Sequence, residues 1–224
     1  GSGSRKHARD SSSSSHHHHH KKPKLLGVSK ILKEFRDNNG ERVVLKSRDS
    51  HRHKFVPDKH SPIIIVPSAS SSLLTLYNVK QFLEGKSYLP SREIRRQTPK
   101  KPKAVHVKHK SERNPNKQIR YVVIDDPRRL TYEDWNQVVA VFVTGAEWQL
   151  SYFPFKNPKP KEVFSRICGF HLNMKGETPK KNIGVWNVKK LEIGQQRYGD
   201  KETVYAFWQT LIPFQKARFP HLYI

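Results

Sequence analysis

The sequence predicts an α/β domain with a mixed or mostly parallel central sheet that is covered by helices on both faces. Short apolar runs rich in β-branched residues alternate with segments that have helical apolar spacing, which is the pattern of this class. The runs are continuously apolar instead of alternating, as in strands that are buried on both faces. A chain of 224 residues is long enough for one such domain and a tail.

The first half of the domain predicts a strand, a short loop and a helix. Ile63–Val66 is a β-branched run that Pro67 ends. The serines that follow can cap a helix over residues 73–85, in which Leu73, Leu76, Tyr77 and Leu83 share one face. Residues 91–118 are rich in Lys, Arg and His and lack an apolar period. They predict an inserted basic loop.

The second half predicts the remaining strands and two helical segments. Thr131 and Asp134 are spaced like a capping box for a short helix. A final amphipathic helix is marked by Val204, Phe207, Trp208 and Leu211, and Pro213 must kink or end it. The predicted strands cover residues 119–124, 138–143, 167–172 and 185–193, and a helical turn covers residues 161–166.

Charge divides the chain into an arm and a domain. Residues 1–118 hold 27 Lys and Arg against 9 Asp and Glu, whereas residues 119–224 hold 16 against 10. Residues 1–60 predict a basic, largely disordered arm, and residues 61–224 the folded domain. The run His16–His20 is either a purification tag or a natural metal-binding tract. The net charge of +24 favours nucleic acid, a phosphorylated peptide or an acidic protein surface as the partner.

No residue pattern predicts a catalytic, cofactor or metal site. A phosphate-binding loop after the first strand needs G-x-x-x-x-G-K-[ST], but residues 66–72 contain neither Gly nor Lys. Asp125 and Asp126 before Pro127 indicate a turn more than a Mg²⁺ site. The single cysteine, Cys168, excludes an internal disulfide and lies in apolar company, which indicates a buried residue in a reducing compartment. We therefore predict a protein that is not an enzyme and binds no cofactor.

Four side chains are candidates for partner binding. Lys80 falls on the apolar face of the first predicted helix, so it must snorkel, pair with an acid or be held for an acidic or phosphorylated ligand. Arg128, Arg129 and Trp148 can supply guanidinium groups and an aromatic platform for a phosphopeptide. The alternative for Trp148 is that it caps the core.

Several segments resemble one known family. They are Pro62–Ala69 running into residues 73–83, Trp135–Gln149, Val185–Glu192 and Ala206–Leu211. In this order and spacing they strongly resemble the C-terminal domain of the parafibromin family, over residues 62–224 apart from the basic segment. The resemblance implies a Ras-like α/β domain that has lost nucleotide binding.

The same resemblance implies a function in the nucleus. Parafibromin-like proteins are subunits of the RNA polymerase II-associated factor complex, which accompanies elongating polymerase on chromatin and supports histone modification. The implied role is a non-catalytic adaptor or scaffold that binds phosphorylated polymerase or elongation-factor tails. A general nucleic-acid-binding module, using the arm and the basic loop, is the alternative, and a GTPase-like enzyme is a third, less favoured class.

Overall fold

The computed structural model of the chain describes residues 1, 3, 35–36, 42–43, 58–98 and 100–223, and its centre is a six-stranded sheet. The strands in spatial order are β4 Val105–Lys110, β5 Gln118–Ile124, β3 Ile63–Ile65, β6 Val138–Phe142, β7 Cys168–Met174 and β8 Lys189–Ile193. Neighbouring strands are parallel except β4, which runs antiparallel to β5. The predicted mostly parallel α/β sheet is confirmed. A separate antiparallel pair joins β1 Phe35–Arg36 and β2 Arg42–Val43. Apart from these two strands and residues 1 and 3, the predicted arm lies outside the described residues as far as residue 57.

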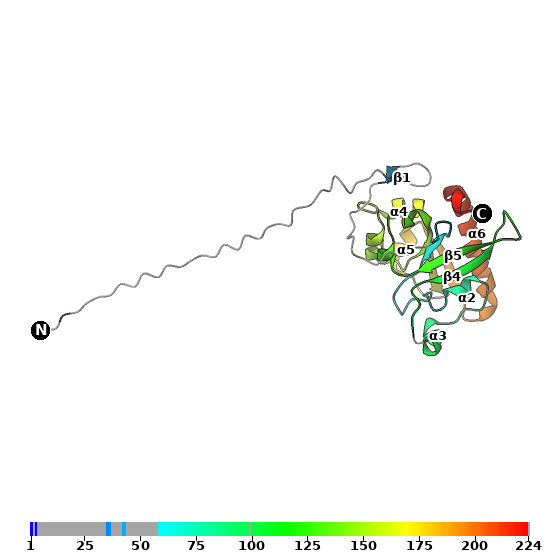
Figure 1. Cartoon of the computed structure of the whole chain (residues 1–224). Coiled ribbons are helices and arrows are strands. Elements are labelled where there is room, and N and C mark those ends of the chain that lie inside the picture. The colour runs from blue at the N-terminus through cyan, green and yellow to red at the C-terminus, as the bar shows by residue number, and fades with distance from the viewer. Residues whose placement is uncertain (2, 4–34, 37–41, 44–57, 99, 224) are drawn as a thin grey trace.

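Helices cover both faces of the sheet and make it a three-layer domain (Figure 1). The apolar side chains of α2 and α6 belong to one hydrophobic cluster, and those of α4 and α5 belong to the other. β3 alternates between the two, because Ile64 joins the first cluster while Ile63 and Ile65 join the second. The helices are α2 Val79–Leu83, α3 Ser91–Gln97, α4 Pro160–Arg166, α5 Lys181–Val185 and α6 Asp200–Arg218, and 3₁₀ turns span Pro127–Arg129 (η1), Asp134–Gln137 (η2), Glu147–Tyr152 (η3), Arg197–Gly199 (η4) and Pro220–Leu222 (η5).

The helix predicted over residues 73–85 forms only over Val79–Leu83. The cause is Asn78, whose fully buried side chain binds backbone groups both before and after it in the chain. Its Oδ1 accepts from Thr75 N at 2.9 Å, and its Nδ2 donates to Leu73 O at 2.7 Å and Leu89 O at 2.9 Å. Residues 73–78 are therefore held as turns, which local periodicity does not reveal.

The prediction of a loop over residues 91–118 is wrong, because this segment contains α3 and β4. Val107 of β4 is fully buried, while His106, Lys108 and Lys110 are exposed. An edge strand commonly carries Lys on its exposed face, which discourages pairing with another chain. Because basic residues occupy the exposed positions of β4, the two-residue periodicity of a strand is hard to recognise in its sequence.

Near the C-terminus one predicted boundary is wrong, and one of two predicted alternatives, that Pro213 ends the last helix, is excluded. Val185 ends α5 and is exposed, so the strand predicted from residue 185 begins at Lys189 instead. α6 does not end at Pro213 but continues to Arg218. Pro213 lacks an N–H and so removes one helical hydrogen bond, and the buried side chains on either side, Ile212 and Gln215, keep the helix packed.

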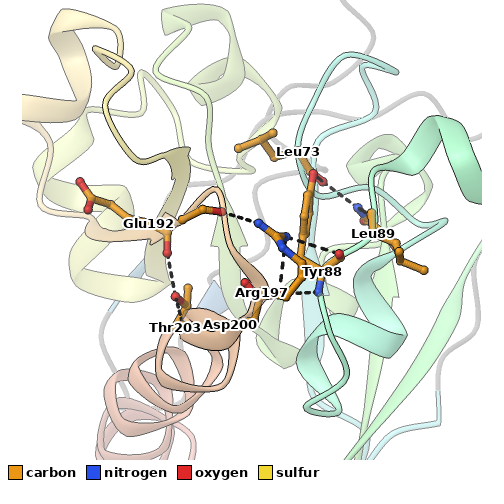
Figure 2. Close-up of polar contacts among 10 residues, drawn as sticks. Leu73, Tyr88, Leu89, Glu192, Arg197, Asp200 and Thr203 are labelled. Carbon is orange, nitrogen blue, oxygen red and sulfur yellow. Dashed lines mark hydrogen bonds and ion pairs between the residues drawn. The ribbon is translucent and has the colours of Figure 1, made fainter.

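Buried polar contacts fasten α6 to the rest of the domain. Asp200, which is 2% exposed, accepts from Tyr88 N at 2.8 Å and lies 3.5 Å from Arg197 Nη1, as Figure 2 shows. Further along the helix, Tyr121 of β5 donates through its hydroxyl to Gln215 Oε1 at 2.7 Å. These contacts join sequence segments that are about a hundred residues apart.

Helix side chains also bind the backbone of both edge strands. On β4, Lys80 Nζ donates to His106 O at 2.9 Å, and Glu84 Oε1 accepts from Lys108 N at 3.2 Å. On β8, Thr203 Oγ1 donates to Glu192 O at 2.7 Å (Figure 2).

Candidate functional site

A pocket of about 510 Å³ lies where β3, β5 and β6 end. We call it the carboxyl-edge pocket. In parallel α/β sheets, ligands bind in the crevice outside the carboxyl ends of the strands. The position makes this pocket the candidate site. Its lining residues are Ile65, Val66, Pro67, Ser68, Ala69, Lys101, Asp125, Asp126, Pro127, Arg128, Val141, Phe142, Val143, Thr144, Trp148, Gln149 and Tyr152.

One wall of the pocket is the segment after β3, where a nucleotide-binding protein of this class carries its phosphate loop. Val66 N donates to Ile124 O at 2.9 Å, which keeps the backbone beside β5. Pro67 has no N–H to offer, and Ser72 N donates to Ala69 O at 3.0 Å in a turn. The segment thus lacks the glycine conformations and the lysine that wrap and neutralise nucleotide phosphates.

At the carboxyl end of β5, the pocket lining contains two acids that are paired with two cations. Asp125 forms an ion pair with Lys101, which comes from the segment before β4. Asp126 accepts from Arg128 Nε at 2.9 Å and from Arg128 Nη2 at 3.3 Å. Partial burial works against ionisation of Asp126, but the hydrogen bonds from the side chain and backbone of Arg128 hold its pKa below the usual value. The Arg128 side chain is 65% exposed, so an anion that binds its guanidinium more strongly than Asp126 does can reach it from solvent.

Another part of the pocket lining is the loop after β6, which is next to β3 in the sheet, and a glycine shapes this loop. Gly145 has a φ of +94° and lies against α5, where a Cβ would be 3.0 Å from Ile183 Cγ1. Asn182 Nδ2 donates to Gly145 O at 2.9 Å, and buried Gln149 accepts from Thr144 N at 2.8 Å. These contacts hold the turn between β6 and η3 against the body of the domain.

Trp148 is presented to solvent by this loop. It is 61% exposed, and its ring meets Tyr152 edge to face at 5.7 Å. Burial raises the pKa of Tyr152 to about 12, so its hydroxyl stays protonated near neutral pH. The pocket lining thus contains both an exposed indole and the exposed guanidinium of Arg128, which offer an aromatic platform and a cation to one ligand.

The structure brings together two of the four predicted partner-binding residues. Arg128 and Trp148 both line the pocket. Arg129 donates to Lys103 O at 3.1 Å, and Lys80 forms an ion pair with Glu84 at 2.9 Å on the β4 edge, so both lie outside the pocket lining. Lys101 was missed, because only the fold brings it to Asp125, 24 positions along the sequence.

Cys168 is the first residue of β7 and is 6% exposed. Burial raises the pKa of its thiol to about 12, as expected for a buried structural residue. In the part of the chain that the structure describes, no three His, Cys, Asp or Glu side chains are grouped so that they could hold a metal ion. None of the described helices has the length and apolar character needed to cross a bilayer.

Comparison with known proteins decides the family. The sequence profile described as "RNA pol II accessory factor, Cdc73 family, C-terminal" matches residues 58–214. The chain belongs to the Cdc73 family. The predicted resemblance to parafibromin, which is the same family under another name, is therefore confirmed.

Relatives from distant organisms agree with this assignment. The Cdc73 family member of Caenorhabditis elegans, Cell division cycle protein 73, is 36% identical over 163 residues, which are 72% of this chain and 31% of the worm protein. Cell division control protein 73 of Saccharomyces cerevisiae is 34% identical over 155 residues, 68% of this chain and 38% of the yeast protein. The chain thus spans about a third of the length of these curated relatives.

A solved structure supports the fold. The conserved domain of yeast Cdc73 superposes with a TM-score of 0.63 at 34% identity, covering 71% of this chain and 99% of that domain. The predicted Ras-like class of the Cdc73 domain is confirmed.

Proposed function

We propose that this chain is a non-catalytic adaptor of RNA polymerase II transcription elongation that works in the nucleus. In this proposal it recruits the polymerase-associated factor complex to phosphorylated polymerase or elongation-factor tails on chromatin, where histones are modified. Membership of a family described as an RNA polymerase II accessory factor supports the setting. The observation that carries the binding role is the exposed pair of Arg128 and Trp148 in the carboxyl-edge pocket.

The chemistry of the pocket favours binding over catalysis. Both carboxylates of its lining, Asp125 and Asp126, are engaged with cations, and the segment that begins at Pro67 is not a phosphate loop. A phosphate on a peptide, with a charge of about −1.5 to −2 at pH 7, can compete with Asp126 for the Arg128 fork. Bidentate guanidinium–phosphate pairs are strong and directional. Trp148 then supports the residue next to the phosphate.

Peptide titration of the full chain tests the proposal. A phosphorylated polymerase-tail peptide is expected to bind at least tenfold more tightly than its unphosphorylated form. Arg128→Ala should remove most of this difference, and Trp148→Ala should weaken both peptides. The matched controls are Arg95→Ala, an exposed arginine on α3, and Tyr198→Ala, an aromatic side chain that is 90% exposed. Equal binding of the two peptides to the unaltered chain would sink the adaptor proposal.

Two more measurements separate the alternatives. Lys80→Ala should leave peptide affinity unchanged, because Lys80 is engaged at the β4 edge. Loss of binding without loss of melting temperature would instead assign the peptide site to Lys80. Micromolar affinity for a guanine nucleotide would favour the GTPase-like alternative.

A further inference from the structure

One face of β4 and β5 carries an uncovered group of cations. Lys108 and Lys110 of β4 and Arg120 of β5 are exposed, and His106 lies beside them. We call these four side chains the basic sheet face. In β5 the same face continues into Val122 and Ile124, which are buried in the cluster with α4 and α5. The helical layer therefore covers one end of this face of the sheet and leaves the basic end open.

Like charges are placed directly opposite each other on this face. In the antiparallel register, Lys108 pairs with Arg120, and Lys110 pairs with Gln118. Like charges in directly opposed positions destabilise a sheet. The arrangement weakens the domain slightly on its own, and an anion bound between the two cations would remove this effect.

Nearby acids do not neutralise the face. Glu112 follows β4 but hydrogen-bonds to Tyr223, whose side chain packs in the cluster on the opposite side of the sheet. Glu84 is engaged with Lys80 and the backbone of the strand edge. Among the described residues, no carboxylate forms an ion pair with Lys108, Lys110 or Arg120.

The electrostatic potential at the basic sheet face is positive, and the lowered pKa of His106 reflects this. Burial lowers the pKa of His106, and the charges of Arg120 and Lys80 lower it further. Nearby positive charge thus opposes a further proton on this face. The same positive charge attracts an anionic ligand.

The spacing of the cations favours a polymer with regularly repeated charge. Lys108 and Lys110 lie on one face of a strand, where alternate residues are about 6.8 Å apart. One nucleic-acid strand carries one negative charge per nucleotide, so two lysines at this separation can contact phosphates of the same strand. Trp, Tyr and Phe, which are the large rings on which bases commonly stack, are absent from the basic sheet face. Binding would then be to the backbone and independent of sequence.

We propose that the basic sheet face binds the phosphate backbone of nucleic acid, at a surface separate from the carboxyl-edge pocket. This goes beyond the adaptor function and does not depend on it. It also assigns the role to a folded face of the sheet, whatever the basic arm contributes.

Salt-dependent binding of a fluorescein-labelled 20-base-pair duplex DNA to the full chain tests this proposal. The variant combines Lys108→Gln, Lys110→Gln and Arg120→Gln. The control combines Lys175→Gln, Lys189→Gln and Lys190→Gln, three exposed lysines at the other end of the sheet. Both lower the net charge by three and keep the arm, so their comparison isolates the position of the charge.

The expected result is a change in slope. Each lost phosphate contact lowers the slope of log K against log salt by about 0.9 in magnitude. The slope of the face variant should therefore be smaller by about 2.7, and that of the control should be almost unchanged. Between 50 and 200 mM KCl, a slope of 2.7 corresponds to about a 40-fold change in affinity. The single change Arg120→Gln should lower the slope by about 0.9 and leave the melting temperature equal or higher.

Two results would overturn the proposal. One is that the face variant and the control have the same slope and affinity. The other is that the face variant keeps DNA binding but loses the phosphorylated tail peptide, which would make the face a peptide site. Failure of this DNA-binding proposal can be distinguished from failure of the adaptor proposal, because Arg128→Ala and Trp148→Ala should leave DNA binding unchanged.

Discussion

Replacing Gly145 by Ala should destabilise the domain and disturb the wall of the carboxyl-edge pocket. An L-residue in the left-handed region costs about 1–2 kcal/mol, and Gly145 has a φ of +94°. The added Cβ would also lie 3.0 Å from Ile183 Cγ1 and 3.0 Å from Lys180 Cβ. Crowding of this kind costs about 1–3 kcal/mol. The two effects together predict a loss of about 2–5 kcal/mol in the free energy of unfolding.

The chain supplies a matched control for the backbone part of this effect. Gly176 has a φ of +91°, and a Cβ there would meet nothing within 4 Å. Gly176→Ala should therefore cost only the backbone part, about 1–2 kcal/mol. The difference between the two variants isolates the contact of the β6–η3 turn with α5.

Urea unfolding followed by tryptophan fluorescence measures both variants. Gly145→Ala should unfold at a lower urea concentration than Gly176→Ala. Only Gly145→Ala should also bind the phosphopeptide more weakly, because the turn that carries Trp148 must shift. Equal destabilisation by the two substitutions would refute the argument, since the packing against Ile183 would then contribute nothing measurable.

Three other predictions concern the core. Tyr121→Phe should cost about 1–2 kcal/mol by leaving Gln215 Oε1 buried without its donor, and adding Gln215→Leu should restore part of this loss in a double-mutant cycle. Burial, opposed by Glu112, lowers the pKa of His109, so the folded state favours the neutral ring and should lose stability as pH falls below about 6.5. His109→Phe should then lose less melting temperature than the unaltered chain between pH 7.5 and 5.5, and an equal loss would contradict this. Cys168 should not react with a disulfide reagent at pH 8 until urea unfolds the domain, and fast labelling of the native protein would show that the site is open.

Local sequence patterns predicted the parts of the fold that local interactions decide. The run Ile63–Val66 identified the central strand, because a continuous β-branched segment suits burial on both faces. Thr131 and Asp134 form the predicted capping box, with Asp134 Oδ2 accepting from Thr131 N at 2.8 Å and Thr131 Oγ1 accepting from Asp134 N at 3.2 Å. Both signals lie within a few residues of the structure that they specify.

Long-range contacts account for what was missed. The buried side chain of Asn78 joins Leu73 to Leu89, and nothing near position 78 announces that role. β4 looked like a loop because its exposed positions are basic, and only pairing with β5 gives it a structure. In the pocket, Arg128 and Trp148 were found from residue type, whereas Lys101 required the fold to bring it to Asp125.

The contacts at the two sheet edges limit how this domain can recognise a peptide. An exposed edge strand can accept a further strand from a partner, or from another copy in aggregation. On β4, Lys80 and Glu84 already occupy the carbonyl of His106 and the N–H of Lys108, and on β8 Thr203 occupies the carbonyl of Glu192. A strand added along either edge must displace these side chains. A peptide partner is therefore directed away from the two sheet edges and toward a site such as the carboxyl-edge pocket. The same side chains also hinder the edges of this open six-stranded sheet from pairing with the strands of other copies.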